Sequence, residues 1–254
     1  MSLWTYEHAV TLLPAVAVFA LISFGLRALL KNKSRAVRMI PVPVIAVILL
    51  LLEAGKQGLS FKYGYDLYHI PLHFCSLFLY VIPAFAFYKG KYSRTVGTIA
   101  ATLCTSVFLL MMIYPNLIYG DFNIRAFFTD FFSFHTVVFH NLVVLLLFLI
   151  LALDLYTPEK GKEVWVPAVF MLCYSAIAAP LAQILRTNYN NFYSCNIPPL
   201  ESLRMLVQNG LGYWPAQIMY VLIVVALDVG FVMLARFCYL QTHRLLHRVP
   251  TKKI

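Results

Sequence analysis

The feature that most constrains this chain is a series of seven apolar runs, each long enough to cross a membrane as a helix. About 20 apolar residues are needed to cross a bilayer in helical form. The runs lie at residues 8–30, 39–57, 70–88, 95–114, 133–153, 164–185 and 214–238. No polar or glycine- and serine-rich linker divides them. We therefore predict an all-α integral membrane bundle of seven transmembrane helices, with residues 1–254 forming a single domain.

The composition agrees with burial in lipid and argues against other partners. Charged residues make up 12% of the chain, about half the share in soluble domains. The net charge of +10 could suggest a nucleic acid partner, but the basic residues lie in short clusters between the apolar runs, which is the pattern of membrane topology. We therefore expect no nucleic acid partner. Most of the five cysteines lie inside apolar runs, so a disulfide framework is not expected.

The distribution of lysine and arginine predicts the orientation. Fifteen of the 20 lie at one set of run ends, in segments 27–38, 89–94 and 160–162 and in the C-terminal tail from residue 236. Cytoplasmic segments carry an excess of these residues. The N-terminus is therefore predicted to lie outside and the C-terminus in the cytosol.

With this orientation, polar side chains gather at the outer run ends. Polar groups within a membrane are costly and usually face the bundle interior, so a one-sided group predicts a functional site. Its members include Glu53, Lys56, His69, His73, Cys75, Tyr114, Asn116, His135, His140 and Asn141. Taken singly, each histidine is more often an interfacial anchor, and Glu53 and Lys56 can simply pair along one helix face. Asp228, inside the last run, is a lone carboxylate that needs a partner.

Cys75 is the candidate nucleophile of this group. Pro71 suits the first position of a helix, which would put Cys75 just past the first turn, where the helix terminus and nearby imidazoles favour a reactive thiol. His73 is two residues away and would point elsewhere. A histidine of the fifth run, His140 or His135, is the better base because it can approach from a neighbouring helix. A zinc site formed by Cys75, His73 and one of these histidines stays open as an alternative.

The last outer loop combines a polar start with an amphipathic stretch. Leucine and valine at helical spacing over residues 199–209 predict a short helix lying on the outer leaflet, and Tyr213 and Trp214 would anchor the last run at headgroup level. The polar run at Asn188 and Tyr189 is interpreted, from the sequence alone, as a solvated turn.

Three motifs in order resemble the YwaF-like bacterial integral membrane proteins. "HIPLHFCSLFLY" at 69–80 resembles their LPLHLCS stretch, "TNYNNFYSCNIPPLESL" at 187–203 their TNY…KPP…SLL loop, and "LGYWPAQIMYV" at 211–221 their LGPWPWY segment. That family is similar to a eukaryotic transmembrane acyltransferase that moves arachidonoyl groups between phospholipids through a cysteine. The resemblance implies that Cys75 matches the motif cysteine, His140 the fifth-run histidine, and Asn188 and Tyr189 the loop motif. His135 is an extra histidine, Ala216 and Gln217 replace an aromatic pair, and the acid of the last run is Asp228.

The leading hypothesis is therefore a membrane-embedded lipid acyltransferase that acts near the outer leaflet through Cys75 and His140 or His135. Residues expected to bind or orient the substrate are Glu53, His73, Tyr114, Asn116, Asn188, Tyr189 and Asp228. The expected partners are membrane lipids, a phospholipid donor and a lysolipid or other acyl acceptor. No metal or cofactor is expected, because the ester bond already supplies the activation. The alternatives are a multi-pass transporter or receptor with an outward-facing polar pocket, and a purely structural membrane protein. The resemblance favours a bacterial cell membrane, with the endoplasmic reticulum as the alternative.

Overall fold

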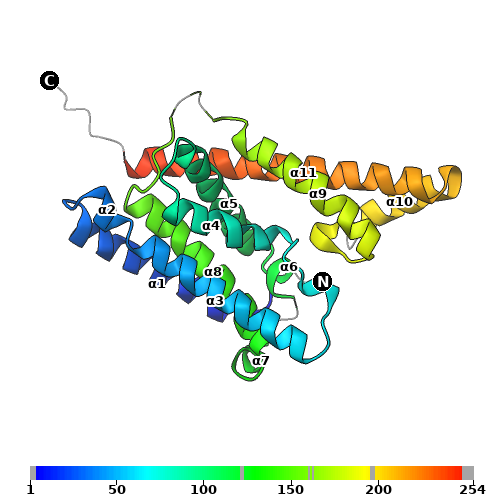
Figure 1. The fold of residues 1–254 in the computed structure, drawn as a ribbon, viewed down its shortest axis with the longest axis horizontal. Helices are drawn as coiled ribbons and strands as arrows, with labels where there is room; N and C mark the ends of the chain where they lie inside the picture. Colours follow the sequence, from blue (N-terminus) through cyan, green and yellow to red (C-terminus); the bar gives the residue numbers. More distant parts are fainter. Residues whose placement is uncertain (1–3, 121–122, 160, 162, 195–197, 248–254) are drawn as a thin grey trace.

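A computed structural model describes residues 4–120, 123–159, 161, 163–194 and 198–247, and within these ranges every regular element is a helix (Figure 1). The long helices are α1 (Tyr6–Leu30), α3 (Pro41–Lys62), α5 (Ser93–Ile113), α8 (Phe131–Ala152), α9 (Val166–Leu185) and α11 (Tyr213–Leu246). The shorter α-helices are α2 (Arg35–Arg38), α4 (Phe78–Phe87), α6 (Asn116–Tyr119), α7 (Ile124–Thr129) and α10 (Pro198–Leu211). Three 3₁₀ segments are η1 (Leu67–His69), η2 (Phe74–Leu77) and η3 (Tyr189–Asn191). The prediction of an all-helical fold is confirmed.

The described residues contain six helices that are long and apolar enough to span a membrane, rather than the seven expected. The difference lies in the run at 70–88. Ile70 precedes a proline and is extended (ψ 131°), as residues before proline prefer, and His73 is also extended (ψ 157°). Helical structure therefore begins only at Phe74, and η2 with α4 reaches about 21 Å at 1.5 Å per residue, less than the roughly 30 Å of a bilayer core.

Helix α5 lies at the centre of the bundle and packs against α4, α8, α9 and α11. Small side chains make this possible, because they let helix backbones approach closely. Within a membrane, helices associate through such packing rather than through the hydrophobic effect. Ala100, Ala101 and Cys104 are fully buried on α5, and Gly97 is buried near its start. By contrast, α1 packs mainly on α8 and leaves most of its apolar side chains exposed, as expected of a lipid-facing helix.

Gly97 offers a direct test of this close packing. A Cβ built there would lie 2.7 Å from Cδ2 of the buried Tyr156 ring, whose hydroxyl is hydrogen-bonded to Thr98 Oγ1 at 2.7 Å. Gly97→Ala is expected to destabilise the protein by about 1–3 kcal/mol, because the ring must move. The matched control is Gly58→Ala on α3, where a Cβ meets nothing within 4 Å and the better helix propensity of alanine adds about 0.5–1 kcal/mol. Thermal unfolding in detergent should therefore give opposite shifts in Tm; a Gly97→Ala Tm at or above wild type would contradict this packing.

The bundle has two opposite ends at which the helices begin or finish. At one of them, which we call the basic end, arginines of α2 and α5 contact the segment between α8 and α9. Arg38 donates to the Leu153 carbonyl at 2.7 Å, Arg35 donates to the Leu155 carbonyl at 3.1 Å, and Arg94 pairs with Glu159 at 2.7 Å. The C-terminal part of α11 reaches the same end, where the Tyr239 hydroxyl donates to the Tyr156 carbonyl at 2.8 Å.

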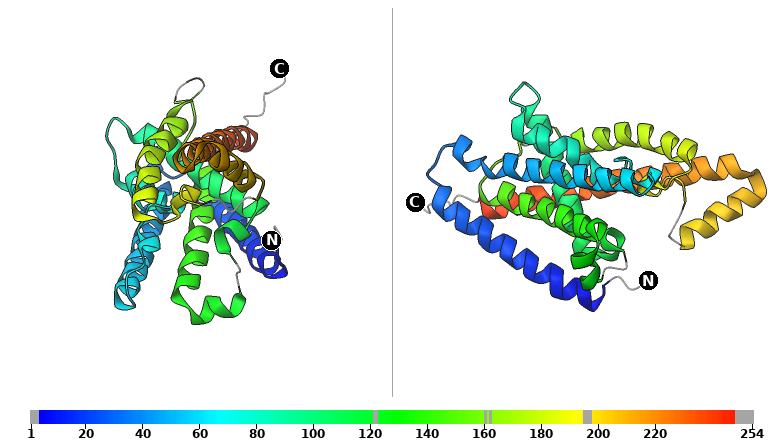
Figure 2. Two further views of the ribbon diagram at one scale, coloured as in Figure 1. Left: turned by 90° about the vertical axis from the view of Figure 1, so that its right-hand side faces the viewer. Right: turned by 60° about the horizontal axis from the view of Figure 1, so that its bottom comes forward.

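The predicted helix at 199–209 is confirmed as α10, which packs against α11. Gly212 joins the two helices with φ +86°, a conformation that favours glycine. The two helices form a hairpin at the end of the molecule far from the C-terminus (Figure 1 and the right view of Figure 2). Helix α11 has 34 residues and is about 51 Å long, so it is longer than a bilayer core is thick.

Candidate functional site

The segment before Cys75 is non-helical, and side chains from elsewhere in the fold satisfy its carbonyl oxygens. A buried carbonyl without a partner costs free energy, and this is most costly near a membrane. Four of these carbonyls accept hydrogen bonds of 2.5–2.9 Å, Leu67 from Tyr189, Tyr68 from His73, His69 from Gln57 and Leu72 from Tyr174. The donors come from α3, from α9, from the loop after α9 and from the segment itself. The break in the third apolar run is therefore held in place by the surrounding helices.

Glu53 is the centre of a buried ionic group on α3. Its carboxylate accepts from Lys56 at 2.8 Å and from Gln57 at 2.6 Å, and it contacts His135 Nε2 of α8 at 3.2 Å. The predicted pairing of Glu53 with Lys56 is confirmed, and the carboxylate is only 9% exposed. An ionised group at this depth needs such partners, because desolvation otherwise costs more than a single ion pair returns. This group ties α3 to α8.

The two histidines of α8 have different surroundings. His135 faces the Glu53 carboxylate through Nε2. His140, a little more than a turn further along, donates from Nδ1 to the Thr136 carbonyl at 2.6 Å. That hydrogen bond leaves the neutral ring with a lone pair on Nε2, and Nε2 is buried with no hydrogen-bond partner among the described residues. Nε2 of His135 is likewise buried without a hydrogen bond among the described residues. The two rings differ because His135 Nε2 contacts a carboxylate at 3.2 Å, whereas the Nδ1 hydrogen bond of His140 fixes its lone pair on Nε2.

Cys75 is the second residue of η2 and is half-buried. His73 is the N-cap of η2, and its ring is committed to the Tyr68 carbonyl through Nε2. The sequence expectation that His73 does not serve Cys75 is consistent with this hydrogen bond.

Tyr68 is a neighbour of Cys75 that the sequence interpretation missed. The phenol of Tyr68 is protonated at neutral pH, as tyrosine side chains normally are, and it can donate a hydrogen bond. Gln57 was likewise not among the predicted site residues. The Gln57–Glu53 spacing of four on one helix was a signal that could have found Gln57.

The loop after α9 is not a solvated turn, and that interpretation was wrong for Tyr189. Tyr189 is fully buried, and its ring packs edge-on to His73 with centroids 5.3 Å apart. The side-chain oxygen of Asn188 accepts from the backbone N–H groups of Tyr193 and Ser194 and so closes the loop. The loop thus contacts the segment that carries His73 and Cys75.

Asp228 has a partner that the sequence did not identify. Asn190, in the same loop, donates from Nδ2 to Asp228 Oδ2 at 2.6 Å. The hydrogen bond connects α11 with the loop that holds Tyr189. The acid of the last apolar run therefore belongs to the same side of the fold as the broken segment.

Tyr114 and Asn116 lie where α5 ends and α6 begins. Helix α6 also approaches α8, because the Tyr119 ring lies edge-on to His140 at 6.3 Å and its hydroxyl accepts from Asn141 at 3.0 Å. Among the remaining cysteines, Cys104 is buried as expected, whereas Cys173 is exposed and Cys238 is half-buried. Cys195 lies outside the described residues.

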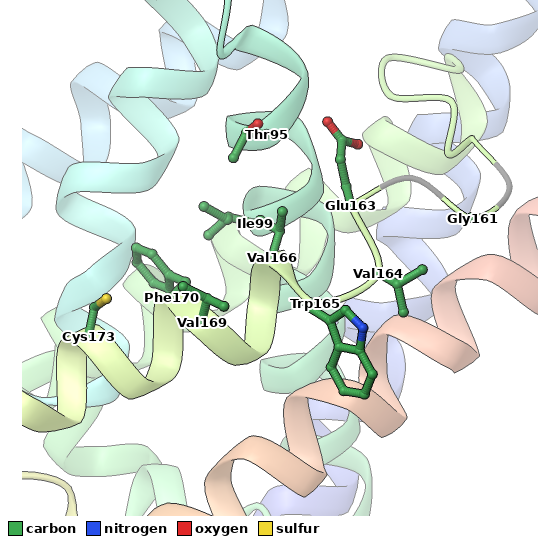
Figure 3. A pocket seen from close by; sticks show the side chains of 10 residues that line it. All are labelled: Thr95, Ile99, Gly161, Glu163, Val164, Trp165, Val166, Val169, Phe170 and Cys173. Carbon is green, nitrogen blue, oxygen red and sulfur yellow. The ribbon is translucent and has the colours of Figure 1, made fainter.

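An apolar groove of about 640 Å³ lies between the start of α9 and α5 (Figure 3). It is lined by Thr95 and Ile99 of α5 and by Gly161, Glu163, Val164, Trp165, Val166, Val169, Phe170 and Cys173. Glu163 at its edge accepts from Thr98 at 2.9 Å and contacts Arg94 at 3.4 Å. The groove belongs to the basic end and contains none of the predicted site residues.

The fold defines a multi-pass helical membrane protein, and Glu53, His135 and His140 are buried polar side chains within it. The model of the TMEM164 family matches residues 3–234, and the chain belongs to that family. This is the eukaryotic transmembrane family to which the YwaF-like proteins were said to be similar. A relation of this chain to the YwaF-like proteins themselves stays a prediction. No curated protein and no solved structure matches the chain.

Proposed function

We propose that the chain crosses the membrane seven times, with the N-terminus outside and the basic end in the cytosol. The short η2–α4 unit is the third crossing, completed by the non-helical segment before it. Non-helical backbone at membrane depth is tolerated where protein covers it, and the hydrogen bonds to its carbonyls support this role. The contacts at the basic end bring together the segments rich in lysine and arginine, in agreement with the positive-inside rule.

Thiol labelling tests this topology. A cysteine introduced by Lys91→Cys, between α4 and α5, should react with a membrane-impermeant maleimide only from the cytosolic side. One introduced by Lys62→Cys, at the end of α3, should react only from outside. Labelling of both variants from one side would contradict an odd number of crossings between them.

We further propose that the protein is a lipid acyltransferase in which Cys75 is the nucleophile and His140 the base. His140 Nε2 takes the thiol proton as Sγ attacks the ester carbonyl carbon of a phospholipid. The ester C–O bond breaks, the leaving lysophospholipid oxygen takes that proton, and the acyl group stays on Sγ as a thioester. A lysolipid hydroxyl then gives its proton to His140 and attacks the thioester. The C–S bond breaks, and the leaving sulfur takes the proton from His140, which returns the thiol and the neutral imidazole. All atoms come from the two lipids and the two side chains.

The observation that carries this proposal is the state of the His140 ring. A general base needs a nitrogen lone pair and a hydrogen bond that fixes the other nitrogen. The hydrogen bond from Nδ1 to the Thr136 carbonyl fixes the ring, and the unpartnered Nε2 has the lone pair. Tyr68 and Asn188 are candidate donors to the oxyanion of the tetrahedral intermediate.

The thioester intermediate is the experimental target. The protein in nanodiscs is incubated with a diacyl phospholipid of one defined acyl chain, and the intact mass is measured before and after treatment with hydroxylamine, which cleaves thioesters. The expected result is a single adduct with the mass of that acyl group, mapped to Cys75 and lost with hydroxylamine. Acyl exchange that proceeds without such an adduct would rule out the cysteine route.

The hydrogen bond between Asn190 and Asp228 favours one other function, a transporter or receptor with a polar pocket. Intramembrane carboxylates mark substrate and proton pathways, and this one is connected to the loop that packs on the His73 segment. In that case Asp228→Asn would abolish uptake or binding of a small molecule, and no acyl adduct would form on Cys75.

A further inference from the structure

Three metal-ligating side chains converge at the basic end, far along the chain from Cys75. Asp154, His243 and His247 each have a ligand atom within 4.8 Å of the other two. Within the described ranges, this is the one group of three or more histidine, cysteine, aspartate or glutamate side chains that meets this distance. None of the three has a part in the acyl-transfer proposal, so the two inferences are independent.

The local structure explains why these residues meet. Helix α8 ends in a Schellman-type turn, in which the Leu155 N–H donates to the Ile150 carbonyl at 3.1 Å and Asp154 takes the left-handed conformation with φ +52°. Glycine is usual at that position, and an aspartate there brings a carboxylate to the helix end. His243 and His247 are four residues apart on the last turns of α11, so both face the same side. Their ring centroids are 4.5 Å apart.

Two of the candidate ligands, His247 and Asp154, are held by contacts outside the group, as outer-shell partners hold metal ligands. His247 donates from Nε2 to the Leu151 carbonyl at 2.8 Å, and the Thr157 hydroxyl donates to Asp154 Oδ1 at 3.0 Å. His243 is 7% exposed and contacts Asp154 Oδ1 through Nε2 at 2.9 Å. The rings and the carboxylate are therefore oriented in advance.

We propose that Asp154, His243 and His247 bind a zinc ion at the basic end. Two imidazoles and one carboxylate suit Zn²⁺, with water completing a four-coordinate site. The ion takes the place of the proton that His243 Nε2 donates to Asp154, and in the neutral imidazole that proton moves to Nδ1. Bound zinc joins the C-terminal end of α11 to the turn after α8, about 90 residues earlier in the chain. It therefore stabilises the end of the bundle opposite the Cys75 site.

The test uses metal-stripped full-length protein in detergent, titrated with Zn²⁺ against a chromophoric chelator and, separately, with Co²⁺. The wild type should bind one equivalent of zinc, and its Tm should rise with zinc. Co²⁺ should give visible bands without the near-ultraviolet thiolate band that a cysteine ligand would produce.

Two variants remove one ligand each while keeping local contacts. Asp154→Asn retains the shape and tolerates the left-handed backbone, and His247→Gln retains an amide donor for the Leu151 carbonyl. Each variant should bind zinc about 100-fold more weakly or worse, because loss of even an outer-shell partner can weaken metal binding by up to about 100-fold. Each should also lose the zinc-dependent rise in Tm. The matched control His73→Gln, at the other end of the bundle, should bind zinc as the wild type does.

Several results would overturn the proposal. They are the absence of an equivalent of bound zinc, an Asp154→Asn variant that binds as tightly as the wild type, or affinity lost in His73→Gln or Cys75→Ala. If a ligand variant fails to fold, as judged by its Tm without zinc, the Co²⁺ spectrum of the wild type decides, because a thiolate band contradicts this ligand set. None of these results depends on acyl transfer.

Discussion

Replacing Cys75 by alanine is expected to abolish both the acyl adduct and acyl exchange, lowering the rate of transfer at least about 10³-fold. The reason is that no other group can form the covalent intermediate, and a nucleophile that is removed cannot be compensated by binding alone. Folding should survive, because Cys75 is only half-buried and the hydrogen bonds that hold the segment come from other side chains, such as Gln57 and Tyr174. Exchange is measured as transfer of a labelled acyl chain from a phospholipid to an added lysophospholipid in nanodiscs.

The matched control is Cys238→Ala, which removes another half-buried thiol from α11. It should leave both exchange and Tm unchanged. A Cys75→Ala protein that unfolds at the wild-type temperature and still exchanges acyl chains would show that the thiol is not the nucleophile.

The helices of this fold follow from local sequence, whereas the break before Cys75 does not. Apolar runs of sufficient length become helices because the chain must satisfy its own backbone in lipid, and six of the expected runs did so. The third run looks similar in composition, and Pro71 suggests a helix start. The actual start at Phe74 depends on Tyr174 and Tyr189, which lie more than 100 residues away and bind the Leu72 and Leu67 carbonyls. Hydrogen-bond partners so distant in the sequence cannot be predicted from a local pattern.

The same distinction separates the parts of the candidate site. The Glu53–Lys56 pair could be predicted because spacing of three on a helix determines the contact. The partner of Asp228 could not, since Asn190 is 38 residues away and reaches it through the fold of a loop. Asn188 and Asn190 are alike in sequence, yet one closes the loop and the other binds the acid. The choice between His135 and His140 depended on side-chain rotamers, which periodicity does not specify.

His140→Gln is expected to lower the rate of acyl transfer by about 10²–10⁴-fold, the usual contribution of a general base. This corresponds to about 2.7–5.4 kcal/mol of transition-state stabilisation. A glutamine amide can still donate to the Thr136 carbonyl, so the helix should remain intact, but it has no nitrogen that can accept a proton. The loss should fall on kcat more than on KM, because the thiol and the lipid still meet.

His135→Gln is the matched comparison on the same helix, and its effect separates a base from an ion-pair partner. The amide of glutamine can donate to the Glu53 carboxylate as His135 does, and Lys56 keeps that carboxylate paired. Most of the activity should therefore survive, with any loss appearing as a lower Tm. If instead His135→Gln lost activity as His140→Gln is expected to, while His140→Gln stayed active, the proton acceptor would be the ring beside Glu53. The buried, unpartnered Nε2 of His140 would then have no part in the chemistry, and the assignment made from ring geometry would be wrong.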